Sequence, residues 1–299
     1  MADILFVGIK WWGPGPDDFA ALSTRHCCRS FAVVDISSRV TRRLIDHPAL
    51  LKISVQTRLY ARPKRNYDLV VVTSPHRMEE GSLALLRHTG KRIVAWLGDR
   101  PVDERSFVRT HHLYDAVYAA DVSWGQSGPV VQTPHPWPHL VPSGIIDNRH
   151  QVGQSGQLIV VGTAYPDRIS VVQTLISLGT DVKVVGRGWP LSIPQRSPMN
   201  RLDLLAWLQR CGHTVLNLPH SQMRETFNPF FFDLAAAGIP QVCIPAVRNV
   251  LPDMPTVIGL DSPDRLSSNL LDSAVAASAP LRDWVRAHHS IDDRIEGMI

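Results

Sequence analysis

The chain has 299 residues, of which 44% are hydrophobic and 19% are charged, so a largely disordered protein is excluded and two domains are expected. Its formal net charge of +4 favours an anionic ligand but is too small to predict dedicated nucleic-acid binding. The cysteines form no CxxC pair, so we predict reduced thiols rather than a zinc site or a redox motif: Cys27, Cys28, Cys211 and Cys243.

The beginning of the chain also bears on where the protein resides. The first residues, "MADILFVGIK", lack the basic region and the cleavage site of a signal peptide. No apolar run approaches the ~20 residues that span a bilayer. We therefore expect a cytoplasmic protein.

Short apolar runs follow one another through the first half of the chain, and each ends in polar or glycine residues. They are "ILFVGIK", "FAVVDIS", "YDLVVVTSP", "RIVAWLGDRP", "YDAVYAAD" and "PVVQTPHP". Helical patterns such as "GSLALLRHTG" alternate with these runs. Apolar strands that alternate with helices predict a parallel sheet covered on both faces.

A Pro- and Gly-rich segment, 135–157, then interrupts the alternation and is the predicted linker. A second strand–helix series follows, from "LIVVGTAYPDR" to "TVIGLDS", and "LRDWVRAHHSIDDRIEGMI" is expected to form one terminal helix. We predict an α/β protein with two tandem doubly wound, Rossmann-like domains, 1–145 and 156–299, facing a cleft. The last helix is expected to pack back on the first domain. In such folds ligands bind at the carboxyl ends of the strands.

The segment 224–240, "RETFNPFFFDLAAAGIP", carries the clearest local signals. Asn228 is a good N-cap, and Pro229 suits the first helical position. Gly238 suits the position after the helix, and Pro240 blocks its continuation. A helix over 229–237 is therefore predicted.

Two acids flank the start of this predicted helix, Glu225 before it and Asp233 in its second turn. A helix N-terminus offers free N–H groups that suit a phosphate, and carboxylates accept hydrogen bonds from sugar hydroxyls. Both acids therefore fit a nucleotide-sugar site. The alternative is that they only stabilise the helix dipole.

The spacing Glu-x7-Asp followed by "LAAAGIP" resembles the Glu-x7-Glu signature of retaining glycosyltransferases with the GT-B fold. "NPFFFDLAAAG", "VVGTAYPDR", "VVGRGWP" and "VAWLGDRP" are similar to motifs of their CgeB-like, group 1-like branch. The resemblance is strongest over 158–240. Asp233 is one methylene shorter than the usual Glu, and a clear Arg-x4-Lys diphosphate pair is missing, for which Arg168 is the substitute.

The resemblance implies a metal-independent, retaining hexosyltransferase-like enzyme without a cofactor, in which the second domain binds the nucleotide sugar. Glu225 and Asp99 are the expected catalytic residues. Donor contacts are expected from Gly162, Thr163, Tyr165, Arg168, Gly186, Arg187, Gly188, Trp189, Asn217, His220, Glu225, Thr226, Phe227, Asn228 and Asp233.

Several of these residues have structural alternatives. Arg168 also suits a solvated helix start, Trp189 a core position after a glycine turn, and His220 an exposed loop. Asp99 also suits a turn before proline.

The first domain is expected to bind the acceptor, whose identity the sequence leaves open. A loop with Gly8, Trp12 and Gly13 would approach the donor phosphates or the acceptor, or else form a tight turn that packs its tryptophans. The segment 39–65 is rich in Lys and Arg and contains one acid, so it fits an anionic acceptor, a peripheral membrane contact or a plain solvated face.

Two other functions fit the same architecture, a sugar-nucleotide epimerase and a non-catalytic nucleotide- or sugar-binding protein. The GxGxxG fingerprint is missing after the first strand, which argues against an NAD enzyme.

Overall fold

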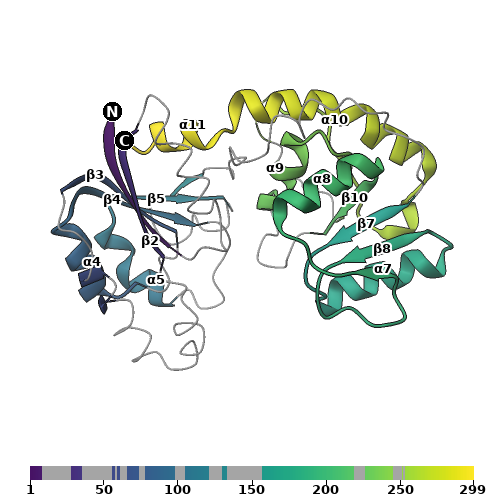
Figure 1. Ribbon diagram of the computed structural model, residues 1–299, viewed down its shortest axis with the longest axis horizontal. Helices are drawn as coiled ribbons and strands as arrows, with labels where there is room; N and C mark the ends of the chain where they lie inside the picture. The colour runs from purple at the N-terminus through teal and green to yellow at the C-terminus, as the bar shows by residue number, and fades with distance from the viewer. Residues whose placement is uncertain are drawn as a thin grey trace. The chain divides into compact units, whose positions relative to one another are not determined.

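The computed structural model describes residues 1–8, 28–35, 56–57, 59–60, 66–73, 78–97, 105–120, 130–132, 157–218, 226–244, 251 and 253–299. The chain forms two compact units, Met1–His139 with Ile291–Ile299, and Leu140–Ser290. Each unit contains a parallel six-stranded sheet (Figure 1). Within the described ranges, every helix is too short or too polar to cross a membrane.

The first sheet has the strand order β2-β1-β3-β4-β5-β6. After β2 is added on one side of β1, the later strands are added on the other side, so the topological switch point lies between β1 and β3. Leu5 of β1 lies in register with Val70 of β3. The strands, each at an apolar run of the sequence, are β1 Ala2–Gly8, β2 Cys28–Asp35, β3 Tyr67–Val72, β4 Gly90–Leu97, β5 Ala116–Ala119 and β6 Val130–Gln132.

Alternate residues of this sheet enter two different cores, because successive side chains of a strand point to opposite faces. Leu5 and Val7 pack with α4 (Glu80–Arg87) and with Phe107 of α5 (Arg105–Thr110). Ile4 and Phe6 pack on the other face with α11 (Ile291–Glu296). Figure 1 shows α4 and α5 on one side of the sheet and α11 on the other. Burial on both faces explains the continuous apolar runs of the sequence.

The second sheet has the order β12-β11-β10-β7-β8-β9, which is the strand order of dinucleotide-binding folds. Its strands are β7 Leu158–Val161, β8 Val182–Val185, β9 Gln195–Arg196, β10 Thr214–Asn217, β11 Gln241–Cys243 and β12 Ile258–Gly259. The short edge strand β9 was not predicted, since its two residues carry no apolar pattern.

Helices cover both faces of this sheet. Val172 and Leu175 of α7 (Pro166–Ser177) belong to one core. Leu205 of α8 (Arg201–Cys211) and Leu234 of α9 (Pro229–Ala236) belong to the opposite core. The long helix α10 (Ser268–His288) contacts α9, β11 and β12. Both predicted α/β sheets are therefore present, each wound on two faces.

Two predictions for helix ends have different outcomes. The helix predicted over 229–237 is confirmed as α9, and Gly238 follows it with a φ of 67°. The prediction of one terminal helix is wrong: α10 begins earlier, at Ser268, and the chain leaves helical geometry at His289 before α11. At the interruption His289 packs against Trp284 and Phe232, with ring centroids 4.2 and 5.5 Å away.

Candidate functional site

The neighbouring strands β7 and β10 form the topological switch point of the second sheet. The chain after β7 enters α7 on one face, and the chain after β10 leads to α9 on the other face. In open α/β sheets ligands bind at the carboxyl ends of the strands at such a point. The residues that follow Val161 and Asn217 therefore define the candidate site.

The start of α9 is built by Asn228 and Pro229. The Asn228 side-chain oxygen accepts a hydrogen bond from Phe231 N at 2.8 Å, which confirms the predicted N-cap. Pro229 occupies the first turn, where its missing N–H costs no helical hydrogen bond. The eight-residue helix thus has an ordered N-terminus at the switch point.

A buried amide network holds this N-cap to the sheet. Asn228 Nδ2 donates to Asn217 Oδ1 at 2.6 Å, and Asn217 Nδ2 donates to Gln241 Oε1 at 3.1 Å. Gln241 Nε2 in turn donates to the Phe231 carbonyl at 3.1 Å. Asn217 is therefore occupied by protein partners. Gln241 was not singled out in the sequence, since its partners are distant along the chain.

Arg168 links the two loops of the switch point. Its Nη1 donates to the Thr163 carbonyl at 3.1 Å, after β7, and its Nη2 donates to the Leu218 carbonyl at 2.7 Å, after β10. Burial lowers the pKa of the Arg168 guanidinium, an effect that nearby Asp167 opposes. The Arg168 cation is thus half-buried and held at the site by two carbonyls. This differs from the alternative of an arginine that extends into solvent.

Glycine is required beneath this guanidinium. Gly162 has a φ of 127°, and a Cβ at that position would lie 2.6 Å from Arg168 Nη1. The Tyr165 ring lies 5.4 Å from the guanidinium carbon and is partly exposed. Gly162, Tyr165 and Arg168 therefore form one local arrangement at the N-terminus of α7.

The turn after β8 packs against the same loop. A Cβ on Gly186 would lie 1.9 Å from the Gly162 carbonyl oxygen, so only glycine permits this approach. Trp189 is 5% exposed, and its indole N–H donates to the Gly162 carbonyl at 2.9 Å. Of the two interpretations of Trp189, the structure favours the core residue over a stacking platform. Arg187 and Gly188 are exposed beside it.

Asp233 faces a cation from the neighbouring helix. Arg201 Nε at the start of α8 lies 2.9 Å from Asp233 Oδ2, and the Asp233 side chain is 12% exposed. The carboxylate at the position of the second signature acid is therefore part of an ion pair between α8 and α9. Arg201 carried no sequence signal, since it is 32 residues from its partner.

Aromatic packing accounts for other expected donor residues. The Phe227 ring stacks on Phe231 with centroids 4.1 Å apart, and Phe231 meets Phe232 edge-on at 5.2 Å. Thr226 and Phe227 are both buried. Their side chains consequently support the start of α9 from within the unit.

The described part of the second unit thus brings most expected donor residues to the carboxyl edge of the sheet. The expected residues that lie outside the described ranges are Trp12, Gly13, Asp99, His220 and Glu225. The basic side chains of 39–65 also lie outside them. In the described residues, no group of three His, Cys, Asp or Glu side chains has the arrangement of a metal site.

Gly8 lies at the corresponding switch point of the first sheet, at the end of β1. A Cβ there would lie 1.8 Å from Thr73 Oγ1, and Thr73 N donates to the Val7 carbonyl at 3.0 Å. Gly8 therefore permits β1 and the residue after β3 to pack closely. Thr73 was not noted in the sequence.

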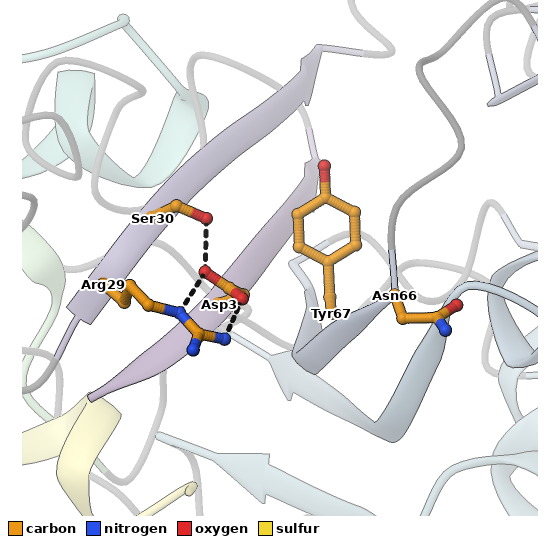
Figure 2. Close-up of a pocket in the computed structure, with 5 residues that line it drawn as sticks. All are labelled: Asp3, Arg29, Ser30, Asn66 and Tyr67. Atoms are coloured by element: carbon orange, nitrogen blue, oxygen red, sulfur yellow. Dashed lines mark hydrogen bonds and ion pairs between the residues drawn. The ribbon is translucent and has the colours of Figure 1, made fainter.

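A cavity of about 410 Å³ lies elsewhere, at the amino ends of β1, β2 and β3 (Figure 2). Figure 2 shows Arg29 and Ser30 directed at the Asp3 carboxylate, and Ser30 Oγ donates to it at 2.6 Å. Asp68 accepts from Asp3 N and from Lys91, which lowers the pKa of Asp68. These charges are satisfied by one another, and the cavity is on the edge opposite to ligand sites of this class. It is therefore not the candidate site.

Two parallel sheets, each covered by helices, match the GT-B fold of solved glycosyltransferases. AviGT4, a glycosyltransferase involved in avilamycin A biosynthesis, matches with a TM-score of 0.61 and 13% identity over 100% of this chain and 97% of that one. An alpha-glucosyltransferase solved with UDP and a mismatched 13-mer DNA matches with a TM-score of 0.60 and 11% identity over 99% and 98%. At such identities the likeness establishes the fold. No family model and no curated protein sequence matches the chain.

Proposed function

We propose that the protein is a glycosyltransferase that moves a sugar from a nucleoside-diphosphate sugar to an acceptor. The observation that carries the proposal is the convergence of the Arg168 cation and the N-termini of α7 and α9 at the switch point of the second sheet. Helix N-termini and arginine both favour a diphosphate. The GT-B fold supports the same reading.

In the proposed donor complex the diphosphate lies at the carboxyl edge of β7 and β10. The leaving diphosphate gains negative charge during transfer, and fixed donors that face it lower the barrier. Arg168 and the Phe230 N–H, the first-turn amide of α9 that the N-cap does not use, supply this stabilisation without a metal. The exposed residues nearby, Thr163, Tyr165 and Arg187, are the proposed contacts to the rest of the donor.

The two signature acids have separate proposed roles. Glu225 is the proposed catalytic carboxylate and contacts the donor sugar. The transfer is proposed to retain the anomeric configuration of that sugar. Asp233, held by Arg201, supports the nucleotide side of the site. The first unit, with Gly8 and Asp99, is the proposed acceptor domain.

A thermal-shift panel of UDP, GDP, dTDP and ADP sugars tests the donor class. A nucleotide present at 100 times its dissociation constant stabilises the native protein by about 2.7 kcal/mol. A rise in melting temperature with one nucleotide supports the proposal, and a flat response to all of them contradicts it. With that donor alone, conversion to an epimeric sugar nucleotide would identify an epimerase instead, because an epimerase needs no acceptor.

Replacement of the first acid tests the catalytic assignment. Glu225→Ala is expected to abolish sugar transfer while the melting temperature and nucleotide binding stay near those of the unsubstituted protein. Full transfer activity in the purified variant would rule out the assigned role.

A further inference from the structure

Gln241, at the first position of β11, is a buried polar residue with both ends of its amide in use. It is 4% exposed, and its side chain lies between the end of β10 and the first turns of α9. Its oxygen accepts from Asn217 Nδ2, and its nitrogen donates to the Phe231 carbonyl, both at 3.1 Å. A side chain buried this deeply must satisfy both groups, since an unpaired buried amide is costly.

The same network continues to the end of α9 that faces the candidate site. Asn217 Oδ1 accepts from Asn228 Nδ2, so the Asn228 amide has one orientation. In that orientation Asn228 Oδ1 is directed at Phe231 N and caps the helix. Phe231 is therefore held twice, at its N–H by Asn228 and at its carbonyl by Gln241.

We propose that Gln241 is a positioning residue for diphosphate binding: it orients Asn217 and Asn228, and through them fixes the first turn of α9, in which the Phe230 N–H is the donor that the N-cap leaves for the diphosphate. This inference rests on the proposed function. Its chemical basis is that hydrogen-bond donors bind an anion strongly only when their directions are fixed in advance. Gln241 itself has no contact with the ligand, because its amide is buried and both its oxygen and its nitrogen bond to the protein.

A second glutamine provides a matched control. Gln209 of α8 also donates its amide to a carbonyl of the α9 region, at Ala237, with a distance of 2.7 Å. Ala237 is the C-cap, at the opposite end of the helix from Asn228. Gln241→Met and Gln209→Met therefore each remove one amide donor to the same helix, and only the first variant breaks the connection to the N-cap.

The test compares the affinity of both full-length variants for the nucleoside diphosphate that the thermal-shift panel selects. Calorimetry is expected to show about tenfold weaker binding for Gln241→Met, the effect of about one well-formed hydrogen bond, and near-unchanged binding for Gln209→Met. Hydrogen exchange gives an independent readout. The Phe231 amide is expected to exchange faster in Gln241→Met only. If Gln241→Met does not fold, Gln241→Asn is used, whose shorter amide cannot reach both partners.

The outcomes separate the inference from the function on which it rests. Equal affinity of Gln241→Met and the unsubstituted protein would overturn the positioning role and leave the proposed function intact. An equal loss in Gln209→Met would also overturn it, since general loosening of α9 would then explain the effect. An unsubstituted protein that binds none of the nucleoside diphosphates overturns the proposed function and the positioning role together.

Discussion

Loss of the Asn228 side chain provides the sharpest test of how the candidate site is held in place. In Asn228→Ala, Phe231 N loses its cap and Asn217 Oδ1 loses its donor. Loss of an N-cap costs about 1 kcal/mol. A buried oxygen left without a partner costs about 1–3 kcal/mol more. The free energy of unfolding is therefore expected to fall by about 2–4 kcal/mol.

Asn200 supplies the matched control, since it caps α8 in the same way. Its Oδ1 accepts from Asp203 N at 2.9 Å, and this cap is exposed. Asn200→Ala removes this cap and an exposed hydrogen bond from Asn200 to the Asp203 carboxylate, which leaves no buried group without a partner, so a cost of about 1 kcal/mol is expected. Asn228→Ser keeps a cap oxygen but loses the amide donor, so its free energy of unfolding is expected to lie between those of the unsubstituted protein and Asn228→Ala.

Urea denaturation followed by far-UV circular dichroism measures these differences. Because α9 belongs to the second unit, the transition to analyse is the one that the nucleotide shifts. Equal losses of about 1 kcal/mol for Asn228→Ala and Asn200→Ala would refute the reasoning, since the buried partner Asn217 would then contribute nothing.

Three further predictions concern other parts of the chain. Arg168→Lys keeps the charge but cannot reach both carbonyls, so nucleotide affinity is expected to fall about tenfold; binding like that of the unsubstituted protein would show that charge alone suffices. Removal of 291–299 takes three fully buried side chains from the first unit, and each contributes about 1.5–3 kcal/mol to the free energy of unfolding. The truncated protein is therefore expected to bind a hydrophobic dye and to aggregate. A monomeric truncated protein that binds no dye would contradict the packing. Burial lowers the pKa of His213, and the positive charge of Lys183 lowers it further. The contribution of the neutral His213 side chain to stability is therefore complete above the unfolded pKa of about 6.5. It is lost as the pH falls through that value toward the folded pKa. Unfolding free energies at pH 8 and pH 5 are expected to differ less in His213→Phe, and an identical pH dependence would argue against the shift.

The fold could be predicted largely because its information is local. Strands buried on both faces appear as continuous apolar runs, and Asn228, Pro229 and Gly238 mark the ends of α9 by their own backbone preferences. The strand orders of the two sheets had no such signal, since pairing between β7 and β10 joins segments more than fifty residues apart.

The candidate site was predictable only in part, for the same reason. The sequence correctly placed an N-cap at Asn228, but not that Asn217 and Gln241 hold it. It also gave no sign that Asp233 would face Arg201. Side chains that bond across elements depend on how the helices pack, and packing is a property of the assembled unit.

The first unit is assembled from two separate stretches of the chain, Met1–His139 and Ile291–Ile299. A ribosome synthesises all of Leu140–Ser290 before it adds the residues of α11. One face of the first sheet, with Ile4, Phe6 and Trp96, therefore lacks its contacts with Ile291, Ile295 and Met298 while the intervening unit is being synthesised. Apolar surface that is exposed during synthesis favours misassembly, so slower translation of the intervening unit is expected to increase aggregation of the first.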